Sequence, residues 1–421
     1  MPITRRNLIK AAGAAAALAA LPGLVRGASL PAPRKVIVVG GGFAGSTVAK
    51  YIRLWSGGKV AVTLVDPSAS HVSCVLSNLV LNGRMTLGEL TIAHSKLGPY
   101  GVKIVRGQVT AINPASRSVT LSGGTTLTGD RLILAMGIGF GSVPGWTDRT
   151  RIPHAWIAGQ QTAILRDQVR GLAVGGTFVM TVPKAPYRCP PGPYERACLV
   201  ADILKRRGGG KVVVLDGNPV IQAEKETFER AFSGIYGGIV KYVPNATLLS
   251  VDNANRAVNT SAGTFKGGVV NLLPPHRAPG VILNAGLVPA GQSWAPVDPL
   301  TYESTLFPGV HVIGDSQATG QPKSAHMANS QAKVCADAIV RYSQGFDPLA
   351  DADRTANVTT NSACYSPITY NAASWLTANF RYDATSRGMK LVQLGEADQW
   401  NSENYEDMFE WASNLFTDSF A

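Results

Sequence analysis

The sequence predicts an α/β fold in which two units of alternating strands and helices are followed by a smaller α+β segment at the C-terminus. Apolar, β-branched runs at 34–39 and 60–65 flank a glycine-rich turn and a helical stretch. Similar runs recur at 176–182 and 211–216, again with a helical stretch between them. Strands that alternate with helices form parallel sheets covered by helices. A length of 421 residues suits two or three such domains.

The first 28 residues are predicted to be a targeting signal. The pair Arg5 and Arg6 precedes an alanine-rich run at 11–21, which ends in small residues near Gly27 and Ala28. This pattern is typical of a twin-arginine signal, which exports folded proteins to the periplasm, and an ordinary Sec signal is the alternative. The apolar run is too short to span a bilayer, and no later stretch is long and apolar enough, so no stable membrane insertion is predicted.

The charge of the chain is basic overall, with a formal value of +12, but its basic residues are scattered. No basic run is interleaved with aromatic residues, so nucleic-acid binding is not predicted. From Leu391 to Ala421 the chain has no Lys or Arg and seven acidic residues. We interpret the positive charge as a solvated surface that suits docking of an acidic partner.

The first strand pair carries a G-x-G-x-x-G pattern, followed by a helix predicted from 46 to 55 and by an acid that ends the second strand. The first glycine permits a tight turn, the second lets the backbone approach a pyrophosphate, and the third lets helix and strand pack closely. The helix N-terminus favours an anion, and the acid can accept hydrogen bonds from a ribose. The residues predicted to bind a dinucleotide here are Gly40, Gly42, Phe43, Ala44, Gly45 and Asp66.

Two further predicted strands end in small residues that suit the same nucleotide. The strand at 131–137 ends with Ala135 and Gly137, and the strand at 309–315 ends with Gly314 and Asp315. Three strand ends at one nucleotide favour FAD over NAD alone. We therefore expect a discontinuous FAD-binding domain, formed by residues 34–150 and 275–355, with a helix from about 324 to 342.

The middle segment, residues 151–274, has the strands of a second nucleotide-binding unit but not its glycine loop. Between its strands the loop at 183–195 has one glycine and is rich in proline. Because proline offers no N–H group to a phosphate, we expect that this unit keeps its scaffold and has lost NAD(P) binding. Electrons would then leave by another route.

Five cysteines are the main candidates for chemistry, at positions 74, 189, 198, 335 and 364. Export permits disulfides, but spacing alone leaves the pairing open. Cys74 follows the acid of the second strand closely, so it is either attached to the flavin 8α-methyl or structural. Cys189 has a rigid proline setting that suits one half of a disulfide, whereas Cys198 and Cys335 are expected in the core.

Other chemical signatures are few. Glu195 lies close to Cys189 and could relay a proton, or it could be a helix N-terminal charge. The sequence has no C-x-x-C-H motif for a c-type haem and no G-x-S-x-G motif for a serine hydrolase. No spacing of His and Cys resembles a zinc site, so no metal is predicted.

These segments give the chain a family resemblance. It resembles the flavoprotein subunits of flavocytochrome c sulfide dehydrogenases, within the disulfide oxidoreductase flavoproteins, over nearly its whole length. The most specific match is the run Tyr-Arg-Cys-Pro-Pro-Gly-Pro-Tyr-Glu-Arg at 187–196. The other matching segments are 74–78, 313–315, 323–324, 328–331 and 363–366.

The resemblance implies a cofactor, a redox pair and a partner. It implies that Cys74 carries 8α-S-cysteinyl FAD, that Ser324 lies at the cofactor, that Cys189 and Cys364 form a redox-active disulfide beside the flavin, and that Glu195 does acid–base work. It also implies that residues 356–421 form an interface domain for a c-type cytochrome subunit in a periplasmic heterodimer. Sulfide would attack the disulfide to give a persulfide, and electrons would pass through FAD to the haem.

Two other activities fit the same family features. A sulfide:quinone oxidoreductase shares the fold and a cysteine pair but needs a membrane-seeking surface, whereas the tail at 403–411 is aromatic and acidic. An accessory flavoprotein of a thiosulfate-oxidising system is the second alternative. The sequence does not separate it from a primary sulfide oxidase, nor does it specify which cysteine is attacked or exclude polysulfide and thiol substrates.

Overall fold

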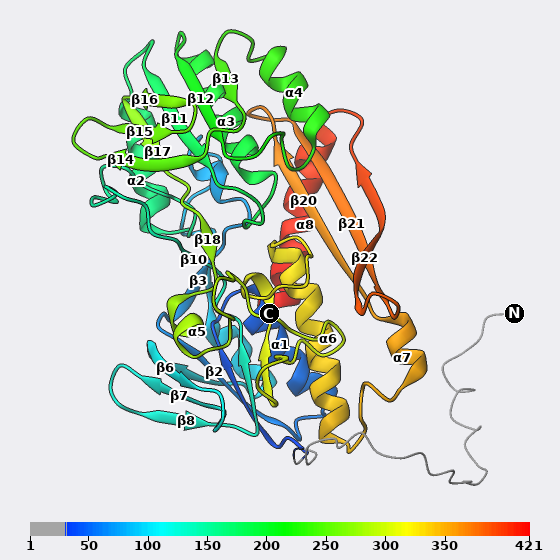
Figure 1. Cartoon of the computed structure of the whole chain (residues 1–421). Coiled ribbons are helices and arrows are strands. Elements are labelled where there is room, and N and C mark those ends of the chain that lie inside the picture. Colours follow the sequence, from blue (N-terminus) through cyan, green and yellow to red (C-terminus); the bar gives the residue numbers. More distant parts are fainter. Residues whose placement is uncertain (1–29, 31) are drawn as a thin grey trace, which may run out of the picture. The chain divides into compact units, whose positions relative to one another are not determined.

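The computed structural model describes residue 30 and residues 32–421 (Figure 1). The predicted signal at 1–28 lies outside the described residues. Residues 32–421 form one compact unit, and the fold described below is the fold of that unit.

A five-stranded parallel sheet forms the first part of the unit. Its strand order is β19-β9-β1-β2-β5, and every neighbouring pair is parallel. The carboxyl ends of these strands therefore lie at one edge of the sheet, where α/β folds bind ligands. This sheet therefore combines strands from residues 35–134 with a strand from far along the chain, at 310–312. The bounds are β1 Lys35–Val39, β2 Ala61–Asp66, β5 Lys103–Arg106, β9 Arg131–Leu134 and β19 Val310–Val312.

Two helices cover this sheet and pack on each other, α1 Phe43–Trp55 and α6 Ala325–Ser343 (Figure 1). Val48 and Ile52 of α1 share one apolar core with Ile339 of α6 and with the strand residues Val36 and Val38. This packing fixes the N-terminal end of each helix near the carboxyl edge of the sheet.

Short elements surround the first sheet. A hairpin and a three-stranded antiparallel sheet follow β2 and β5, and a two-stranded antiparallel pair joins distant segments. The bounds are β3 Ser70–Val72, β4 Thr91–Ala93, β6 Val109–Asn113, β7 Ser118–Leu121, β8 Thr126–Thr128, β10 Gly139–Phe140, β18 His276–Arg277, α5 Gly280–Asn284 and the 3-10 helices η2 Ser77–Val80, η3 His94–Tyr100 and η4 Gly314–Ser316.

The middle segment forms a second parallel sheet, in the order β13-β12-β11-β17. Helix α3 packs Tyr194, Ala197 and Ala201 against it in a core shared with the first sheet. The bounds are α2 Gln160–Gly171, β11 Thr177–Val182, α3 Gly192–Arg206, β12 Lys211–Asp216, α4 Lys225–Ser233, β13 Val240–Val243, β14 Leu248–Asp252, β15 Ala257–Thr260, β16 Gly263–Lys266 and β17 Val269–Asn271.

The C-terminal segment consists of an antiparallel three-stranded sheet and a long helix (Figure 1). Helix α8 buries Tyr405, Met408, Ala412 and Leu415 at helical spacing and packs on α1 and on β21. Its apolar face is therefore used inside the protein. The bounds are α7 Ala352–Asn357, β20 Thr359–Pro367, β21 Ala373–Asp383, β22 Gly388–Glu396 and α8 Ser402–Phe420.

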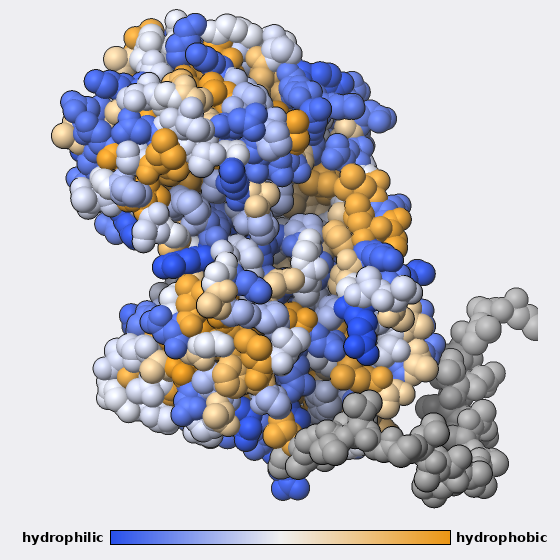
Figure 2. Space-filling model, in the orientation of Figure 1, coloured by the Kyte–Doolittle hydropathy of each residue, from blue (hydrophilic) through white to orange (hydrophobic). Residues whose placement is uncertain are grey.

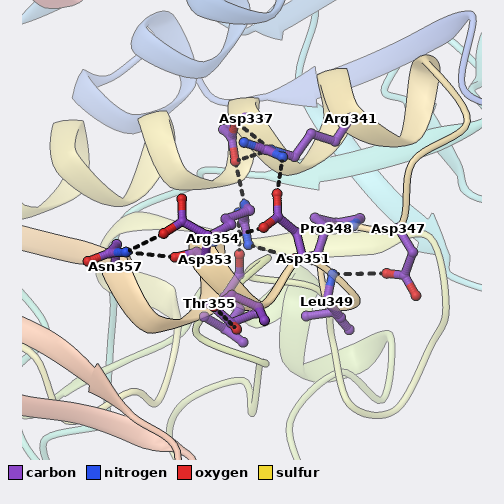
Figure 3. Close-up of polar contacts among 12 residues, drawn as sticks. Asp337, Arg341, Asp347, Pro348, Leu349, Asp351, Asp353, Arg354, Thr355 and Asn357 are labelled. Carbon is purple, nitrogen blue, oxygen red and sulfur yellow. Dashed lines mark hydrogen bonds and ion pairs between the residues drawn. The ribbon is translucent and has the colours of Figure 1, made fainter. Parts of the chain in front are cut away.

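A charged cluster fastens α7 to α6 just before β20 begins (Figure 3). The Arg354 guanidinium is buried and donates to Asp337 at 2.5 Å and to the carbonyl oxygen of Leu300 at 2.8 Å. Asp351 caps α7 and also accepts from Arg341 at 2.7 Å. A buried, multiply bonded arginine holds the chain more firmly than an exposed ion pair, so the start of β20 is fixed relative to α6.

Some element ends differ from the predicted ones. The helix predicted from 46 begins at Phe43, because the glycine turn is tight enough for the helix to start within the G-x-G-x-x-G pattern. The strand predicted at 131–137 ends at Leu134, and the strand predicted at 309–315 ends at Val312. Gly137 and Gly314 have φ values of +68° and +71°, which end extended structure.

Candidate functional site

A cleft of about 590 Å³ opens at the carboxyl edge of the first sheet, where β1, β2, β9 and β19 end. The predicted cofactor residue Gly45 does not line it and packs behind its wall. The predicted cofactor residues that do line the cleft are Gly40, Gly42, Phe43, Ala44, Asp66, Cys74, Ala135, Gly137, Gly314, Asp315 and Ser324.

The glycine turn places bare backbone at the floor of this cleft. Gly40 has a φ of +101°, and a Cβ there would lie 2.4 Å from the carbonyl oxygen of Ala135. A Cβ on Gly45 would lie 1.7 Å from the carbonyl oxygen of Gly40. Helix α1 has no side-chain cap at Gly42, so backbone N–H groups of its first turn are available to a ligand at the positive end of the helix dipole.

Asp66 stands at the end of β2 with both carboxylate oxygens oriented by the backbone. One oxygen accepts from the Gly41 N–H at 2.7 Å and the other from the Ser68 N–H at 2.8 Å. Each carboxylate oxygen has a second lone-pair direction, so the group retains the capacity to accept from the hydroxyls of a ribose.

The other side of the cleft carries a buried charged pair. Asp315 lines the cleft, and the Lys323 ammonium donates to the carbonyl oxygens of Asp315 and Gln317 at 2.8 and 2.7 Å. Lys323 also lies over the Trp294 ring, 3.7 Å from its centroid. Burial lowers the pKa of Lys323 to about 8, against the opposing effect of Asp315. Burial likewise raises the pKa of Asp315, while Arg188 and Lys323 favour its ionised form.

A second, smaller cavity of about 70 Å³ adjoins the cleft. Cys74, Cys189, Cys364 and Glu195 all line it, so the structure brings together the four residues predicted to do the chemistry. Four residues line both cavities and therefore form the wall between them: Cys74, Arg188, Ser324 and Ala325.

Cys189 reaches this cavity because the proline-rich loop pairs with the segment before α6. The Cys189 N–H donates to the carbonyl oxygen of Lys323 at 2.7 Å. Cys189 has a φ of +60°, a left-handed backbone that a side chain other than glycine adopts at some cost. A Cβ on Gly192 would lie 2.7 Å from the Cys189 sulfur, so the start of α3 leaves room for the thiol only because Gly192 stands there.

Cys364 is placed by β20, which runs beside the N-terminus of α6. The hydroxyls of Ser362 and Ser324 share a hydrogen bond of 2.8 Å. The Ala363 N–H donates to His326 Nδ1 at 3.1 Å, and this contact fixes the strand beside the helix. The N-terminal end of α6 is therefore the common support of Cys189 and Cys364.

Cys74 approaches from the loop that follows β3. The Ser77 N–H donates to the carbonyl oxygen of Cys74 at 3.1 Å, and Leu76 has a φ of +65°. This turn leads into η2, where Asn78 donates to the carbonyl oxygen of Gly192 at 3.3 Å. The loop that carries Cys74 thus contacts the start of α3 in the middle segment.

Glu195 is oriented by the Asn78 amide, which Arg196 holds in turn. The Asn78 amide N–H donates to Glu195 Oε1 at 3.0 Å, and the Asn78 carbonyl oxygen accepts from Arg196 at 2.8 Å. Burial raises the pKa of Glu195 to about 8, while the Asn78 hydrogen bond and the Arg196 charge oppose the rise. A carboxyl with this pKa can both take and give a proton near neutral pH.

Burial is the main influence on each of the three thiols of the cavity. Burial raises the pKa of Cys189, and Cys364, Glu195 and Cys74 raise it further as potential negative charges. Burial raises the pKa of Cys364 to about 12, with added effects of Glu224 and Glu195. Burial also raises the pKa of Cys74, although Arg188 opposes the rise. All three cysteines line the same cavity.

All five cysteines are free thiols in the structure, and the predicted Cys189–Cys364 disulfide stays a prediction. Cys198 and Cys335 are fully buried, in two different apolar cores. Sequence reasoning gave no role to Arg188, Arg196 and Trp156, which also line the cysteine cavity. The segment 187–196 contains both arginines, but nothing in a linear sequence shows that they turn inward.

In the middle segment, neighbouring side chains occupy the carboxylate that a second nucleotide would need. The Asp216 carboxylate at the end of β12 accepts from the Tyr194 hydroxyl at 2.7 Å and from the Tyr242 hydroxyl at 2.9 Å. It also accepts from the Asn218 N–H at 2.8 Å. An acid with these partners is engaged within the protein, and the expected loss of NAD(P) binding stays a prediction.

Neither metal ligation nor membrane crossing is indicated by the described residues. Over residues 30 and 32–421, no group of three or more His, Cys, Asp or Glu side chains is placed to hold a metal ion. Over the same residues, no helix combines the length and the apolar character needed to span a bilayer.

Comparisons with known families agree with the segments found above. The family model described as "Sulfide dehydrogenase [flavocytochrome c] flavoprotein chain, central" matches residues 162–274. A pyridine nucleotide-disulphide oxidoreductase model matches residues 34–166. A twin-arginine translocation signal model matches residues 2–22, which confirms the predicted signal and directs the chain to the periplasm.

Individual relatives are sulfide-oxidising flavoproteins. The mitochondrial sulfide:quinone oxidoreductase of Dictyostelium discoideum is 23% identical over 392 residues, which cover 89% of this chain and 82% of that protein. A sulfide dehydrogenase [flavocytochrome c] flavoprotein chain of Chlorobaculum thiosulfatiphilum is 47% identical over 47 residues, 11% of this chain and 96% of that sequence.

The structure of the sulfide:quinone oxidoreductase of Aquifex aeolicus has the same fold. The TM-score is 0.75 at 15% identity, with 92% of this chain and 91% of that chain covered. The predicted α/β fold is thereby confirmed. Together with the family matches, these relatives show that the chain belongs to the sulfide-oxidising flavoproteins, which include flavocytochrome c sulfide dehydrogenase flavoprotein chains and sulfide:quinone oxidoreductases.

Proposed function

We propose that the protein is a periplasmic sulfide:cytochrome c oxidoreductase in which Cys189 and Cys364 form the redox-active pair and FAD is linked to Cys74. The observation that carries the proposal is the wall between the two cavities. Cys74 lines both the nucleotide-type cleft and the cysteine cavity, so a flavin held there would lie next to the pair.

The family depends on FAD, and the residues of the cleft fit that cofactor. The uncapped first turn of α1 suits a pyrophosphate, and the oriented carboxylate of Asp66 suits a ribose. Asp315 and Gly314 provide an acceptor and close backbone on the other side. When bound, FAD would accept two electrons from sulfur and pass them one at a time to a haem.

The cysteine pair would carry the sulfur chemistry. Hydrosulfide attacks one sulfur of the Cys189–Cys364 disulfide, a new S–S bond forms at that cysteine, and the other cysteine leaves as a thiolate with the electron pair. Arg188 and Arg196 line the same cavity. Their positive charges attract the anionic substrate and stabilise a thiolate.

Glu195 is proposed as the acid–base group for the substrate. Its carboxyl lines the cavity and is oriented by Asn78. In the ionised form it takes a proton from hydrogen sulfide and so supplies the nucleophilic hydrosulfide.

Two observations favour a protein as the electron acceptor over a nicotinamide nucleotide or a membrane-bound acceptor. The acid that would bind a nicotinamide nucleotide, Asp216, is engaged by two tyrosines. Helix α8 turns its apolar face inward onto α1 and β21 instead of offering it to a membrane. We therefore propose a c-type cytochrome subunit as the acceptor and heterodimer partner, with residues 356–421 as the interface domain.

A quinone is the second candidate acceptor, favoured by one surface. Leu391, Val392 and Leu394 of β22 are all at least half exposed. Figure 2 shows hydrophobic residues gathered over the sheet of β20–β22. An apolar patch of this kind suits a membrane surface. The accessory role beside a thiosulfate-oxidising system rests on the family resemblance alone.

The deciding experiment measures sulfide-dependent reduction of a soluble c-type cytochrome and of a short-chain quinone by the purified holoprotein. We expect cytochrome reduction to exceed quinone reduction. Cys189→Ser and Cys364→Ser should each lower it on the order of 100-fold or more, because each removes one sulfur of the reacting bond.

The matched control is Cys335→Ala, which removes a thiol buried in α6 away from both cavities and should keep the wild-type rate. Full activity in either serine variant would exclude the disulfide mechanism. Faster reduction of the quinone would move the assignment to the second candidate.

A further inference from the structure

Glu224 is a buried carboxyl outside the cysteine cavity. It caps α4 with a φ of +48°, and its side chain is 0% exposed. One carboxyl oxygen, Oε2, accepts a short hydrogen bond from the Ser366 hydroxyl. The other oxygen, Oε1, makes no well-formed hydrogen bond among the described residues, although the Ser374 hydroxyl also acts on this carboxyl. A buried, half-satisfied carboxyl is costly, so it calls for a functional explanation.

The bonding partner of Glu224 places it beside Cys364. Ser366 follows Cys364 by two positions on β20, so both side chains point to the same face of the strand. That spacing corresponds to about 6.7 Å along the strand. A carboxyl bonded to Ser366 therefore lies within reach of the Cys364 sulfur, directly or through one water molecule.

The same sheet face leads from Cys364 to the surface. Across the sheet Cys364 pairs with Leu376, and Leu376 pairs with Glu396 of β22. The Glu224 N–H donates to Glu396 Oε1 at 3.3 Å. Glu396 is exposed and, together with Cys364, lines a largely apolar groove of about 210 Å³. Glu224 thus contacts the Cys364 strand through its carboxyl, at Ser366, and a solvent-exposed carboxylate through its backbone.

We propose that Glu224 is the proton-relay residue of Cys364. When Cys364 leaves a disulfide as a thiolate, the O–H bond of Glu224 breaks and an S–H bond forms on Cys364. The reverse transfer frees the thiolate for reoxidation. No electrons move in this step. The proposal rests on the proposed function, because it needs Cys364 to be redox-active.

The ionisation of the groups supports this direction. Burial raises the pKa of Glu224 to about 7, against the opposing effects of the Ser366 and Ser374 hydroxyls. Burial, with a smaller contribution from Glu224, raises the pKa of Cys364 to about 12, so the protonated Glu224 carboxyl is the stronger acid of the two. The other ionisable groups that interact with this pair are Glu195 and Cys198 of α3, Glu396 of β22 and the cavity thiols Cys74 and Cys189.

The relay divides the acid–base work between two carboxyls. Glu195 raises the pKa of Cys189 directly, whereas Glu224 heads the charged groups that act on Cys364. Glu195 lines the cysteine cavity, whereas Glu224 lies outside it and bonds to Ser366 of the Cys364 strand. Each cysteine would therefore have its own proton exchange route.

The test follows the alkylation rate of Cys364 by iodoacetamide in the reduced protein, quantified on its peptide by mass spectrometry across pH. In the wild type, ionisation of Glu224 should slow the rise of the rate with pH and give an inflection near pH 7. Glu224→Gln should lose this inflection and react several-fold faster above it, because the neighbouring negative charge is gone.

Two further variants make the outcome decisive. Glu226→Gln, on the exposed side of the same helix, should keep the wild-type inflection. Ser366→Ala removes the hydrogen bond that favours the ionised carboxyl, so the inflection should move to higher pH. An unchanged inflection in Glu224→Gln would overturn the proposal. If that variant does not fold, an unmoved inflection in Ser366→Ala overturns it instead.

An activity measurement separates this proposal from the proposed function. In rapid mixing with sulfide, Glu224→Gln should slow flavin reduction at least several-fold, and Glu226→Gln should not. A wild-type protein that does not oxidise sulfide would contradict the proposed function, while the alkylation result would still report whether Glu224 and Cys364 are coupled. A normal rate of flavin reduction in Glu224→Gln would reject the relay alone.

Discussion

Arg196 illustrates how single residues hold the site. Its guanidinium is almost fully buried, donates to Asn271 at 2.9 Å and to the carbonyl oxygen of Ala155 at 2.7 Å, and stacks on Trp156 with 4.7 Å to the ring centroid. Burial lowers its pKa to about 10, so it stays charged at neutral pH. A planar cation with its donors engaged has one orientation, and it fixes the Asn78 amide in turn.

The fixed amide of Asn78 predicts the pH dependence of turnover. Its N–H donates to Glu195 Oε1, which favours the ionised carboxyl and lowers its pKa. Asn78→Ala should therefore raise that pKa beyond about 8, so that a higher pH is needed to generate the base. The ascending limb of the pH–rate profile should move upward by about one pH unit.

The control for this measurement is Asn371→Ala, on an exposed turn, which should leave the profile unmoved. A downward shift in Asn78→Ala would contradict the assigned direction of the hydrogen bond. A profile that Glu195→Gln leaves unchanged would exclude Glu195 as the base.

Cys74 makes a separate prediction about cofactor attachment. Its sulfur lines both cavities, where the proposed thioether to FAD would form. After acid denaturation the wild-type holoprotein should keep its yellow colour in the precipitate, whereas Cys74→Ser should release the flavin completely. Cys335→Ala should behave like the wild type. Free flavin from the wild-type protein would exclude the covalent link.

At the scale of elements, the turn between β1 and α1 decides whether the nucleotide can bind. Gly45→Ala places a Cβ 1.7 Å from the carbonyl oxygen of Gly40, so the turn must open and its N–H groups must move. We expect the flavin content of the purified protein to fall at least about tenfold.

The matched control is another helical glycine. Gly171 ends α2, and a Cβ there would meet nothing within 4 Å. Gly171→Ala should keep the flavin content and slightly favour the helix. Flavin absorbance per polypeptide measures both variants, and equal contents would contradict the role assigned to the turn.

For the whole molecule, the sequence predicted the elements better than their contacts. The strands at 35–39 and 211–216 follow from runs of β-branched residues, and the glycine turn follows from its motif. These signals are local. That Lys323 would accept a hydrogen bond from Cys189 depends on residues 134 positions apart, and no periodicity reports such a contact.

Part of the candidate site could be predicted from the sequence. Cys74, Cys189 and Cys364 were grouped through a family resemblance, and the structure places them around one cavity. Glu224 carried no signal, because an acid before a helix is ordinarily a solvated cap. Its importance arises only from β20 and β22, whose packing against it depends on the antiparallel register of the C-terminal sheet.

The support shared by the cysteines at the start of α6 has a consequence for substrate choice. One hydrogen bond joins Cys189 to Lys323, and another joins β20 to Ser324. The proline-rich loop and the C-terminal sheet therefore cannot separate without breaking the wall of the cavity. A reagent that reaches the pair through the cysteine cavity must therefore fit a gap of about 70 Å³ as it stands. We expect hydrosulfide to reduce the pair far faster than a tripeptide thiol does at equal thiolate concentration, as measured by the rate of flavin bleaching. Equal rates would show that the loop and the sheet separate in solution, and the cavity would then not select reagents by size.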